Sequence, residues 1–486
     1  MAQVGIVVLA WNKLEYTKKC IESILKNTNF NYFQIIAVNN GSTDGTYEYF
    51  EEMKNKYASV SAFIPVHLSA NLGYGGGMNA GTQVALDNES THICHISNDV
   101  EVQPGWLHPL YECLEKDPSR GLVQPLVLDF ENKVQDCGVI VEINSENYLK
   151  QEGIDRSIEH LRTISESERL YLNGCCLLGT RRFFEEVGGF DEAFAPIYHE
   201  ESDLCLRGHR QGFKMMFCGK STVKHHVRLT TQDMPEIEPL FWEHWELFLK
   251  RHKAYICDLA QERFGEEFNK IEISSFGKDA DLTGAHHKLA EDWNKHTHET
   301  QADNDMFYKT TTHYIADLVN WNNSEYKIGL TNHAIKICIE NNVSTVLDVG
   351  AGILADSIKI RNAGMKVTAI DLDSPHYDFG QFRLEDRKID DIECLYVGDA
   401  LGRYDAVVLL DVIEHIKDIE EFLEQYISKV DRYVFMTIPE VIPPDEHDKH
   451  PMHLLELEEF WKNLPEYMHK KFGFKRIDSM TYVKEG

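Results

Sequence analysis

The sequence predicts two α/β domains, each built on a mostly parallel β-sheet, and three observations support this fold class. The chain has 486 residues, whereas a single hydrophobic core usually stops growing at roughly 250 to 300 residues. Short β-rich runs alternate with amphipathic stretches in both halves, which is the pattern of βαβ units. The composition, with 43% hydrophobic and 26% charged residues, is typical of a folded globular protein.

The order of these runs predicts a first domain over residues 1–275, a linker over 276–306 and a second domain over 307–486. Strands of the first domain are expected at GIVVLA, FQIIAVNN and HICHISND, and strands of the second at STVLDV, KVTAIDLD, YDAVVLL and RYVFMTIP. The segment between them is rich in Gly, Asp, Asn, Thr and His and lacks apolar periodicity. Such a composition favours a linker.

The charge balance and the cysteines restrict the setting of the protein. The chain has 49 basic and 79 acidic residues, a formal charge of −30, which repels nucleic acid and anionic membranes alike. Its eleven cysteines lack any Cys-x-x-Cys pair, and its N-terminus enters an apolar strand without a long apolar run. We therefore expect a cytoplasmic protein with no nucleic-acid partner and no membrane span.

Polar residues follow the predicted strands of the first domain. The second strand ends at Asn39-Asn40 and the third at Asn98-Asp99, with Glu101 two residues further on. In open parallel sheets, ligands bind beyond the carboxyl ends of the strands. Carboxylates there can hold Mg²⁺ or Mn²⁺ beside a phosphate, although an acidic strand end is by itself more often a solvated surface.

Four motifs in sequence order resemble glycosyltransferase family 2 over roughly the first 260 residues. They are VGIVVLAWN, AVNNGSTDGT, NLGYGGGMNAG with the Asn98-Asp99 strand end, and NGCCLLGTRRFFEEVGGFDEAFAPIYHEESD. The resemblance implies a GT-A fold, a nucleotide-diphosphate sugar as donor, Mn²⁺ or Mg²⁺ as cofactor, and inverting transfer. The Asn-Asn-Gly-Ser turn is most similar to rhamnosyltransferase-like members, which implies rhamnose or another deoxyhexose.

The same resemblance assigns roles to individual residues. Asp99 is the expected metal ligand, with His225 favoured over His226 to complete the metal site. Glu201 or Asp203 is the expected catalytic base, with Glu200 beside them, and Glu201 stands where the family usually has aspartate. The expected donor-binding residues are Ala10, Trp11, Asn12, Asn39, Asn40, Asn71, Gly73, Asn98 and Asp99.

The second domain has a glycine turn, VLDVGAG, and an acidic strand end at Asp371 that suits ribose hydroxyls. A dinucleotide oxidoreductase is the rival interpretation, but the third glycine of its motif is missing. Together with GDA and DVIEHI, the pattern resembles class I S-adenosylmethionine-dependent methyltransferases over about residues 310–486, with a Rossmann-like fold. The resemblance implies cofactor binding by Asp348, Gly350, Gly352, Asp371, Asp399 and Asp411.

Two further features of the second domain bear on its activity. Leu354 occupies a position where such turns usually have a small residue, and we expect it to crowd the approach to the cofactor. A sugar hydroxyl needs a base to become nucleophilic, and the candidates are His415, His447, His450 and His453.

The combined hypothesis is a bifunctional enzyme that transfers a sugar and O-methylates it. The acceptor is expected to be a glycan, a lipid-linked molecule or a protein, flagellin being one example. The alternative is a binding or scaffold protein in which one or both domains have lost activity, an interpretation motivated by Asn98 and Leu354.

Overall fold

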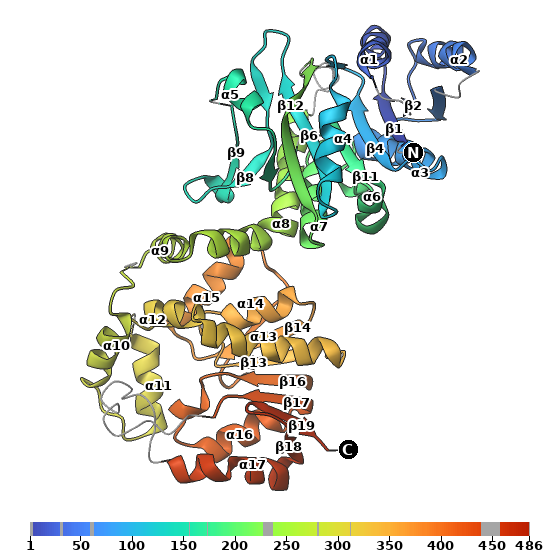
Figure 1. Ribbon diagram of the computed structural model, residues 1–486. Helices are drawn as coiled ribbons and strands as arrows, with labels where there is room; N and C mark the ends of the chain where they lie inside the picture. The colour runs from blue at the N-terminus through green and yellow to red at the C-terminus, as the bar shows by residue number, and fades with distance from the viewer. Residues whose placement is uncertain are drawn as a thin grey trace. The chain divides into compact units, whose positions relative to one another are not determined.

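The computed structural model describes residues 3–29, 33–58, 63–154, 156–172, 174–226, 237–278, 281–311, 313–438 and 457–485. Its contacts divide the chain into two compact units, Met1–Ala260 and Gln261–Gly486. Each unit has its own β-sheet and its own hydrophobic cores (Figure 1). Within the described ranges, no helix is both long and apolar enough to cross a membrane.

The first unit is a mixed α/β structure. Its strands are β1 (Val4–Ala10), β2 (Phe33–Asn40), β3 (Phe63–Leu68), β4 (His92–Ser97), β5 (Val100–Val102), β6 (Arg120–Leu128), β7 (Val134–Asp136), β8 (Val139–Val141), β9 (Leu149–Gln151), β10 (Ser167–Arg169), β11 (Cys176–Thr180) and β12 (Lys214–His225). Its helices are α1 (Leu14–Asn27), α2 (Thr46–Lys56), α3 (Gly73–Asp87), α4 (Leu107–Glu115), α5 (Ile158–Thr163), α6 (Arg181–Val187), α7 (Glu200–Arg210) and α8 (Ile237–Phe264), which crosses the boundary between the units.

The main sheet of this unit has the order β10-β12-β6-β11-β4-β1-β2-β3. Strands β1 to β4 are parallel, whereas β11 runs antiparallel to both β4 and β6. The chain moves from β1 to β2 on one side and returns to β4 on the other, so the carboxyl ends of these strands meet at a switch point of the kind where α/β sheets bind ligands.

Both faces of this sheet are buried. In β1, Ile6 and Val8 belong to the core under α1, α2 and α4, while Val7 and Leu9 belong to the core under α3, α6 and α7. Successive side chains of a strand point to opposite faces. A strand covered on both faces therefore needs an unbroken apolar run, which is what GIVVLA provides.

The glycine-rich motif forms helix α3. A Cβ atom on Gly77 would come within 2.4 Å of the Leu9 side chain, and one on Gly81 within 2.3 Å of the Val7 side chain. Because these glycines have no side chain, the helix lies close against β1. The motif thus serves the packing of α3 on the sheet, rather than forming the open glycine loop that its composition suggests.

The second unit begins with helices and continues as a parallel α/β structure. Its helices are α9 (Glu266–Ser275), α10 (Ala285–Trp293), α11 (Gln301–Thr310), α12 (His313–Asn322), α13 (Glu325–Glu340), α14 (Ala355–Asn362), α15 (Pro375–Asp386), α16 (Ile419–Ile427) and α17 (Glu458–Phe472). Its strands are β13 (Thr345–Val349), β14 (Lys366–Asp371), β15 (Glu393–Tyr396), β16 (Tyr404–Leu409), β17 (Val430–Met436), β18 (Phe474–Arg476) and β19 (Thr481–Lys484).

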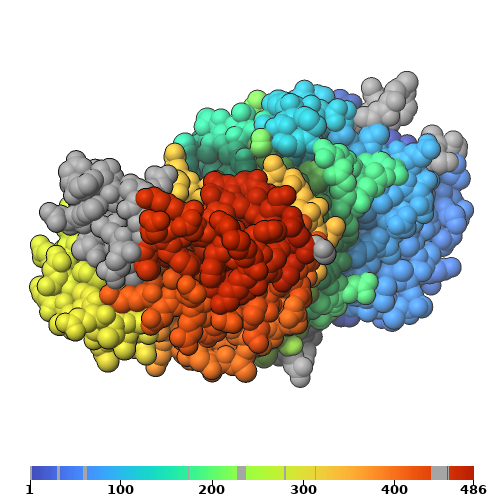
Figure 2. Space-filling model, turned by 90° about the horizontal axis from the view of Figure 1, so that it is seen from below, coloured from blue at the N-terminus to red at the C-terminus, as the bar shows by residue number. Residues whose placement is uncertain are grey.

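The sheet of the second unit has the order β15-β14-β13-β16-β17-β19-β18. Strands β13 to β17 are parallel, and β19 closes one side in the antiparallel sense. The residues nearest the C-terminus, red in Figure 2, gather on one face of this unit. The switch point lies at β13, between β14 and β16, so the glycine turn after β13 is where a ligand is expected.

The segment predicted as a linker, 276–306, contains α10 and the first part of α11. Leu289 and Trp293 of α10 are buried with Phe307 of α11 in a small aromatic core. The contact boundary lies earlier, after Ala260. These helices could not be predicted from apolar periodicity, because only a few apolar residues of each are buried and the rest of the segment is polar.

Candidate active sites

The strand ends of the first unit are joined by side-chain hydrogen bonds. The Asn98 amide nitrogen donates to the carbonyl oxygen of Asn12 (3.2 Å) and to the hydroxyl of Thr17 (2.9 Å). The Asn12 amide oxygen in turn accepts from the backbone N–H of Thr43 (2.9 Å). A carboxylate at position 98 could not donate either bond. Asparagine at this position therefore has a structural reason: it ties β4 to the end of β1.

Asn40 joins β2 to the start of α3. Its amide nitrogen donates to Asn71 Oδ1 (2.8 Å) and to the Gly73 carbonyl (2.9 Å), while its Oδ1 accepts from the N–H of Leu72 (2.9 Å). Asn39 Oδ1 accepts from the N–H of Ser42 (2.9 Å). Three of the predicted donor-binding residues thus form one hydrogen-bonded network, in which Asn40 and Gly73 are buried and Asn71 is exposed.

Asp99 and His225 come together because β12 pairs with β5, which puts His225 opposite Val100. Asp99 Oδ1 lies 3.4 Å from His225 Nε2. His225 Nδ1 lies 3.0 Å from the Gln135 amide oxygen, which can only accept, so the ring proton belongs on Nδ1. Nε2 faces a carboxylate oxygen, so without a proton on Nε2 the ring and Asp99 would offer two electron-pair donors to a cation between them.

The neighbouring histidine has a different partner. His226 Nε2 lies 3.4 Å from Glu101 Oε1, and its ring stacks on Phe130 at a centroid distance of 3.7 Å. The two adjacent histidines therefore face different carboxylates. Among the described residues, no group of three or more His, Cys, Asp or Glu side chains gathers as a metal cluster. A metal here would have two protein ligands and take its other ligands from substrate and water.

Glu200 and Glu201 begin helix α7. Burial raises the pKa of Glu200 well above its usual value, and its Oε2 has no hydrogen-bond partner within the described part of the chain. Burial also raises the pKa of Glu201 to about 7, although backbone N–H groups oppose the rise. A carboxyl with a pKa near neutrality can exchange protons at physiological pH.

Asp203 lies in a different environment on the same helix. Its carboxylate is bonded to Arg207 (2.8 Å), His252 (2.9 Å) and Arg251 (3.3 Å). Burial alone would raise the pKa of Asp203, but hydrogen bonds from His252 and Arg207 lower it to about 2. A carboxylate held by two arginines and a histidine is suited to anchoring α7 against α8 and poorly suited to accepting a proton.

The Gly174–Cys175 segment lies between the strand that precedes Asp99 and the side chain of Glu201. The N–H of Ser97, two residues before Asp99, donates to the Cys175 carbonyl (3.0 Å). A Cβ atom on Gly174 would lie 3.4 Å from the Glu201 side chain, and the Tyr74 hydroxyl donates to the Gly174 carbonyl. Tyr74 was not predicted from the sequence; its only signal was an aromatic residue inside a glycine run.

The glycine turn of the second unit is fixed by Asp371. Its Oδ2 accepts from the N–H of Gly352 (2.7 Å), and its Oδ1 from the N–H of Leu372 (2.6 Å). Gly350 and Gly352 have positive φ angles of 70° and 54°. A Cβ atom on Gly350 would approach the Val412 side chain to 2.6 Å, so glycine is required there for both reasons.

Asp348 and Asp411 are less available to a ligand than expected. Burial raises the pKa of Asp348 to about 7, and its Oδ2 accepts from the Ser357 hydroxyl (2.5 Å). Asp411 is paired with the buried Lys327 (2.9 Å) and also accepts from the Trp321 indole (2.9 Å). Asp399, by contrast, is exposed, and accepts from the N–H of Tyr396 (2.8 Å).

Leu354 has a left-handed backbone, with φ of 58°, and is fully buried. A Cβ atom on Gly380 would lie 2.8 Å from its side chain, so Gly380 leaves the space that Leu354 fills. Its side chain thus packs on α15. His415, one candidate base, makes a ring contact with Tyr308 at 5.9 Å, whereas His447, His450 and His453 lie outside the described residues.

Comparison with known proteins agrees with this division of the chain. Residues 5–184 match the model of glycosyl transferase family 2, and residues 347–430 match that of a methyltransferase domain. N-acetylglucosaminyl-diphospho-decaprenol L-rhamnosyltransferase of Mycobacterium tuberculosis is 28% identical over 222 residues, which are 40% of this chain and 67% of that protein.

Two other matches are weaker or partial. An uncharacterized protein of Sinorhizobium fredii, y4gI, is 25% identical over 276 residues, which are 54% of this chain but only 29% of that protein, so this chain spans less than a third of it. The crystal structure of GalNAc-T7 with UDP, GalNAc and Mn²⁺ gives a TM-score of 0.42 at 16% identity, over 54% of this chain and 51% of that one.

The family models cover the strand ends of the first unit and the glycine turn of the second, which are the two places where the geometry brings the predicted residues together. Residues 5–184 of the first unit therefore form a glycosyltransferase family 2 domain with a mixed α/β fold, and residues 347–430 of the second unit match a methyltransferase domain; both are families of transferase domains.

Proposed function

We propose that the first unit transfers a sugar from a nucleotide-diphosphate donor to an acceptor hydroxyl, and that the second unit O-methylates a sugar with S-adenosylmethionine. The observation that carries the first half is the Gly174–Cys175 segment. It contacts the strand that ends at Asp99 on one side and Glu201 on the other. The proposed metal ligands, Asp99 and His225, and a carboxyl whose pKa burial raises to about 7, that of Glu201, thus flank one short segment.

Asp99 and His225 would hold Mn²⁺ or Mg²⁺. Their facing acceptor atoms, 3.4 Å apart, fit a cation, and the remaining ligand positions are left for diphosphate oxygens and water. When bound, the metal would neutralise the charge that develops on the departing diphosphate. Asn98 holds the strand end in place and leaves Asp99 as the single carboxylate of this motif.

Glu201 is our candidate for the catalytic base. Its carboxylate would take the proton from the acceptor hydroxyl as the acceptor oxygen bonds to the anomeric carbon and the bond from that carbon to the diphosphate oxygen breaks. One displacement of this kind inverts the anomeric configuration. The cluster of Asp203 with Arg207, Arg251 and His252 would position α7, and through it Glu201, without touching substrate.

The proposed donor sugar and acceptor rest on a relative and not on the geometry of the site. The rhamnosyltransferase from M. tuberculosis acts, by its name, on a lipid-linked diphosphate acceptor, which supports a deoxyhexose donor and a glycan or lipid-linked acceptor for this chain. The names of the rhamnosyltransferase and of y4gI do not point to flagellin. None of the eleven cysteines forms a disulfide and ten of them are buried, which supports the reduced, cytoplasmic setting we propose.

In the second unit, Asp371 would accept hydrogen bonds from the ribose hydroxyls of S-adenosylmethionine, while Gly350 and Gly352 let the cofactor approach the backbone. Bound there, the cofactor would supply the methyl group. Asp399, at the next strand end, is exposed and would lie near the adenine. Asp348, bonded to the Ser357 hydroxyl, and Asp411, paired with the buried Lys327, would hold the turn and β16 in place.

The experiment that tests both halves uses the full chain with a panel of nucleotide-diphosphate sugars, Mn²⁺ and methyl-labelled S-adenosylmethionine. Release of nucleoside diphosphate from one donor, lost in Asp99→Asn, would support the glycosyltransferase. Label transfer to the glycosylated acceptor, lost in Asp371→Asn, would support the methyltransferase. If the wild-type chain turns over neither, the degenerate scaffold becomes the better interpretation.

A further inference from the structure

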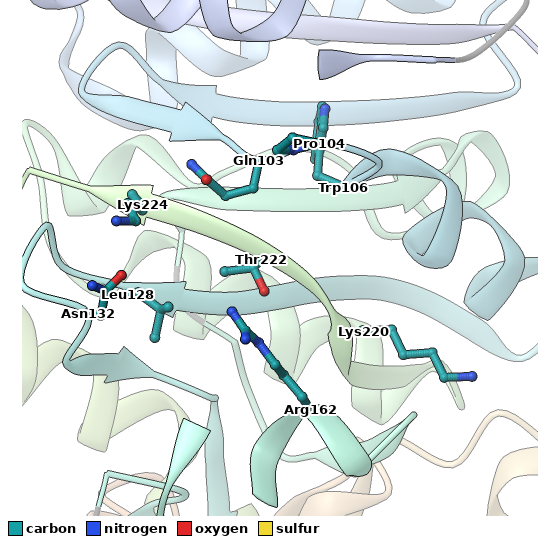
Figure 3. Close-up of a pocket in the computed structure, with 9 residues that line it drawn as sticks. All are labelled: Gln103, Pro104, Trp106, Leu128, Asn132, Arg162, Lys220, Thr222 and Lys224. Atoms are coloured by element: carbon teal, nitrogen blue, oxygen red, sulfur yellow. The ribbon is translucent and has the colours of Figure 1, made fainter. Parts of the chain in front are cut away.

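A cavity of about 400 Å³ opens on the face of β12 that α5 covers (Figure 3). Three cationic side chains line it, those of Arg162, Lys220 and Lys224. The neutral hydrogen-bonding side chains of Gln103, Asn132 and Thr222 complete the polar part of its wall. Its lining includes no carboxylate.

The three cations have no anionic partner in the described part of the chain. No ion pair or side-chain hydrogen bond joins Arg162, Lys220 or Lys224 to any described carboxylate; Lys224 lies over the Phe130 ring at 5.7 Å. The chain as a whole has 79 acidic against 49 basic residues. Three like charges gathered in one cavity of so acidic a protein repel one another unless an anion joins them.

Gly219 of β12 allows α5 to pack closely beside the cavity. A Cβ atom on Gly219 would lie 2.0 Å from the Leu161 carbonyl, and its N–H donates to the carbonyl of Ile164 (3.2 Å). The missing side chain lets α5, which carries Arg162, lie close against β12, which carries Lys220 and Lys224. A register shift in β12 between Cys218 and Thr222 precedes the stretch that carries Thr222 and Lys224.

The cavity is separate from the metal pair. Lys224 directly precedes His225 on β12, and successive side chains of a strand point to opposite faces. Glu101 is opposite Lys224 in the strand pairing, but its carboxylate contacts His226. An anion in the cavity would therefore lie across β12 from the donor diphosphate.

We infer that this cavity binds a phosphate-type oxyanion, a phosphate or diphosphate group carried by a soluble molecule or by a lipid headgroup. Guanidinium offers a planar pair of donors to such a group, and the two ammonium groups add point charges. Amide and hydroxyl donors nearby can bind the remaining oxygens. This goes beyond the proposed function, which places the nucleotide donor at Asp99 and His225.

The test uses the full chain, EDTA and inorganic pyrophosphate, with binding measured by calorimetry. EDTA removes divalent metal, so binding at the metal pair is suppressed. We expect saturable binding that Asp99→Ala leaves unchanged and that weakens by about 10-fold or more in the triple variant Arg162→Gln/Lys220→Gln/Lys224→Gln. These side chains are exposed or half-buried, so the variant should melt at the wild-type temperature.

The matched control is Lys150→Gln/Lys366→Gln/Lys429→Gln, which removes two exposed charges and one half-buried charge elsewhere and changes the net charge equally. It should bind pyrophosphate as the wild type does. Equal losses in both triple variants would mean that net charge, and not the cavity, governs binding, and would overturn the inference. So would pyrophosphate binding that the cavity variant retains in full.

Vesicles identify the source of the anion. Co-sedimentation is measured with phosphatidylcholine vesicles that contain phosphatidic acid and with vesicles of phosphatidylcholine alone. Binding to the first only, lost in the cavity variant, supports a headgroup site; pyrophosphate binding without vesicle binding supports a soluble ligand. Failure of the wild type to bind either probe overturns the inference and leaves the donor site untouched, because the metal-dependent assay reports on that site separately.

Discussion

His225 Nε2 lies 3.4 Å from Asp99 Oδ1, while the next residue, His226, lies 3.4 Å from Glu101 Oε1. Two adjacent histidines thus have two different carboxylate partners. Only the first pair contains the residue, Asp99, that comes just after β4 at the switch point of the sheet. The two pairs allow a matched test of metal binding.

His225→Ala should raise the Mn²⁺ concentration needed for half-maximal sugar transfer by about 10- to 100-fold, since one of two protein ligands is lost. The measurement is a Mn²⁺ titration at saturating donor. His226→Ala is the control and should leave the titration midpoint unchanged. The assignment is wrong if the two variants shift the midpoint equally.

Glu201→Gln should lower kcat by about 100- to 10,000-fold, because the proton acceptor is lost. Since burial raises the pKa of Glu201 to about 7, wild-type kcat should fall as pH drops below about 7, and residual activity of the variant should lack that dependence. A wild-type rate that is flat from pH 5 to 8 would exclude Glu201 as the base.

The same substitution should stabilise the fold above neutral pH. The pKa of Glu201 is higher in the folded chain than its usual value of 4.5, so the folded state binds more protons and loses stability as pH rises from about 4.5 to about 7. Glu201→Gln removes that loss, and its melting temperature at pH 8 should exceed that of the wild type by on the order of 2 °C. At pH 4 the two should melt together.

Asp203→Asn should behave in the opposite way. Its carboxylate is paired with Arg207 and Arg251 and bonded to His252, and removing one partner of a buried pair costs about 3–5 kcal/mol of unfolding free energy. Because the pKa of Asp203 is lowered to about 2, this stability is present above about pH 4 and is lost as pH falls toward 2. Denaturant melts at pH 7 and pH 2.5 measure it, and an equal difference at both pH values would contradict the account.

Leu354→Gly tests whether that side chain obstructs the cofactor. The variant loses a buried side chain, which costs about 2–5 kcal/mol, and regains about 1–2 kcal/mol of left-handed strain. It should therefore be less stable, while its affinity for S-adenosylmethionine stays within about 2-fold of wild type because Leu354 packs on Gly380. Calorimetry decides, and clearly tighter binding would restore the crowding interpretation.

Asp371→Asn should weaken S-adenosylmethionine binding by roughly 10- to 100-fold, the value of hydrogen bonds to a charged group. Asp373→Asn, two residues on and exposed, is the control. If both variants bind as the wild type does, Asp371 does not contact the ribose.

The sequence correctly predicted which residues lie at the carboxyl ends of the parallel strands. The runs before Asn40, Asp99 and Asp371 are strands that end at the sheet edges where ligands are expected, because unbroken apolar runs specify buried parallel strands. The proximity of Asp99 and His225 followed from the family's motif order. These features depend on local pattern and on topology.

Other features depend on contacts between distant segments. The role of Asp203 is decided by Arg251 and His252, nearly fifty residues later on α8, and no local pattern signals that contact. Helix α3 has glycine at positions 77 and 81 because a Cβ there would meet the side chains of Leu9 and Val7. The anion cavity joins Arg162 of α5 to Lys224 of β12, and neither residue belongs to a motif.

The most direct test of the central claim is calorimetric binding of UDP, GDP and dTDP to the wild type and to Asp99→Asn, each with Mn²⁺ and with EDTA. We expect one diphosphate to bind the wild type only with Mn²⁺, and we expect Asp99→Asn to abolish this binding. Absence of binding to the wild type, or equal binding to the variant, would contradict a metal-assisted sugar-nucleotide site at Asp99 and His225.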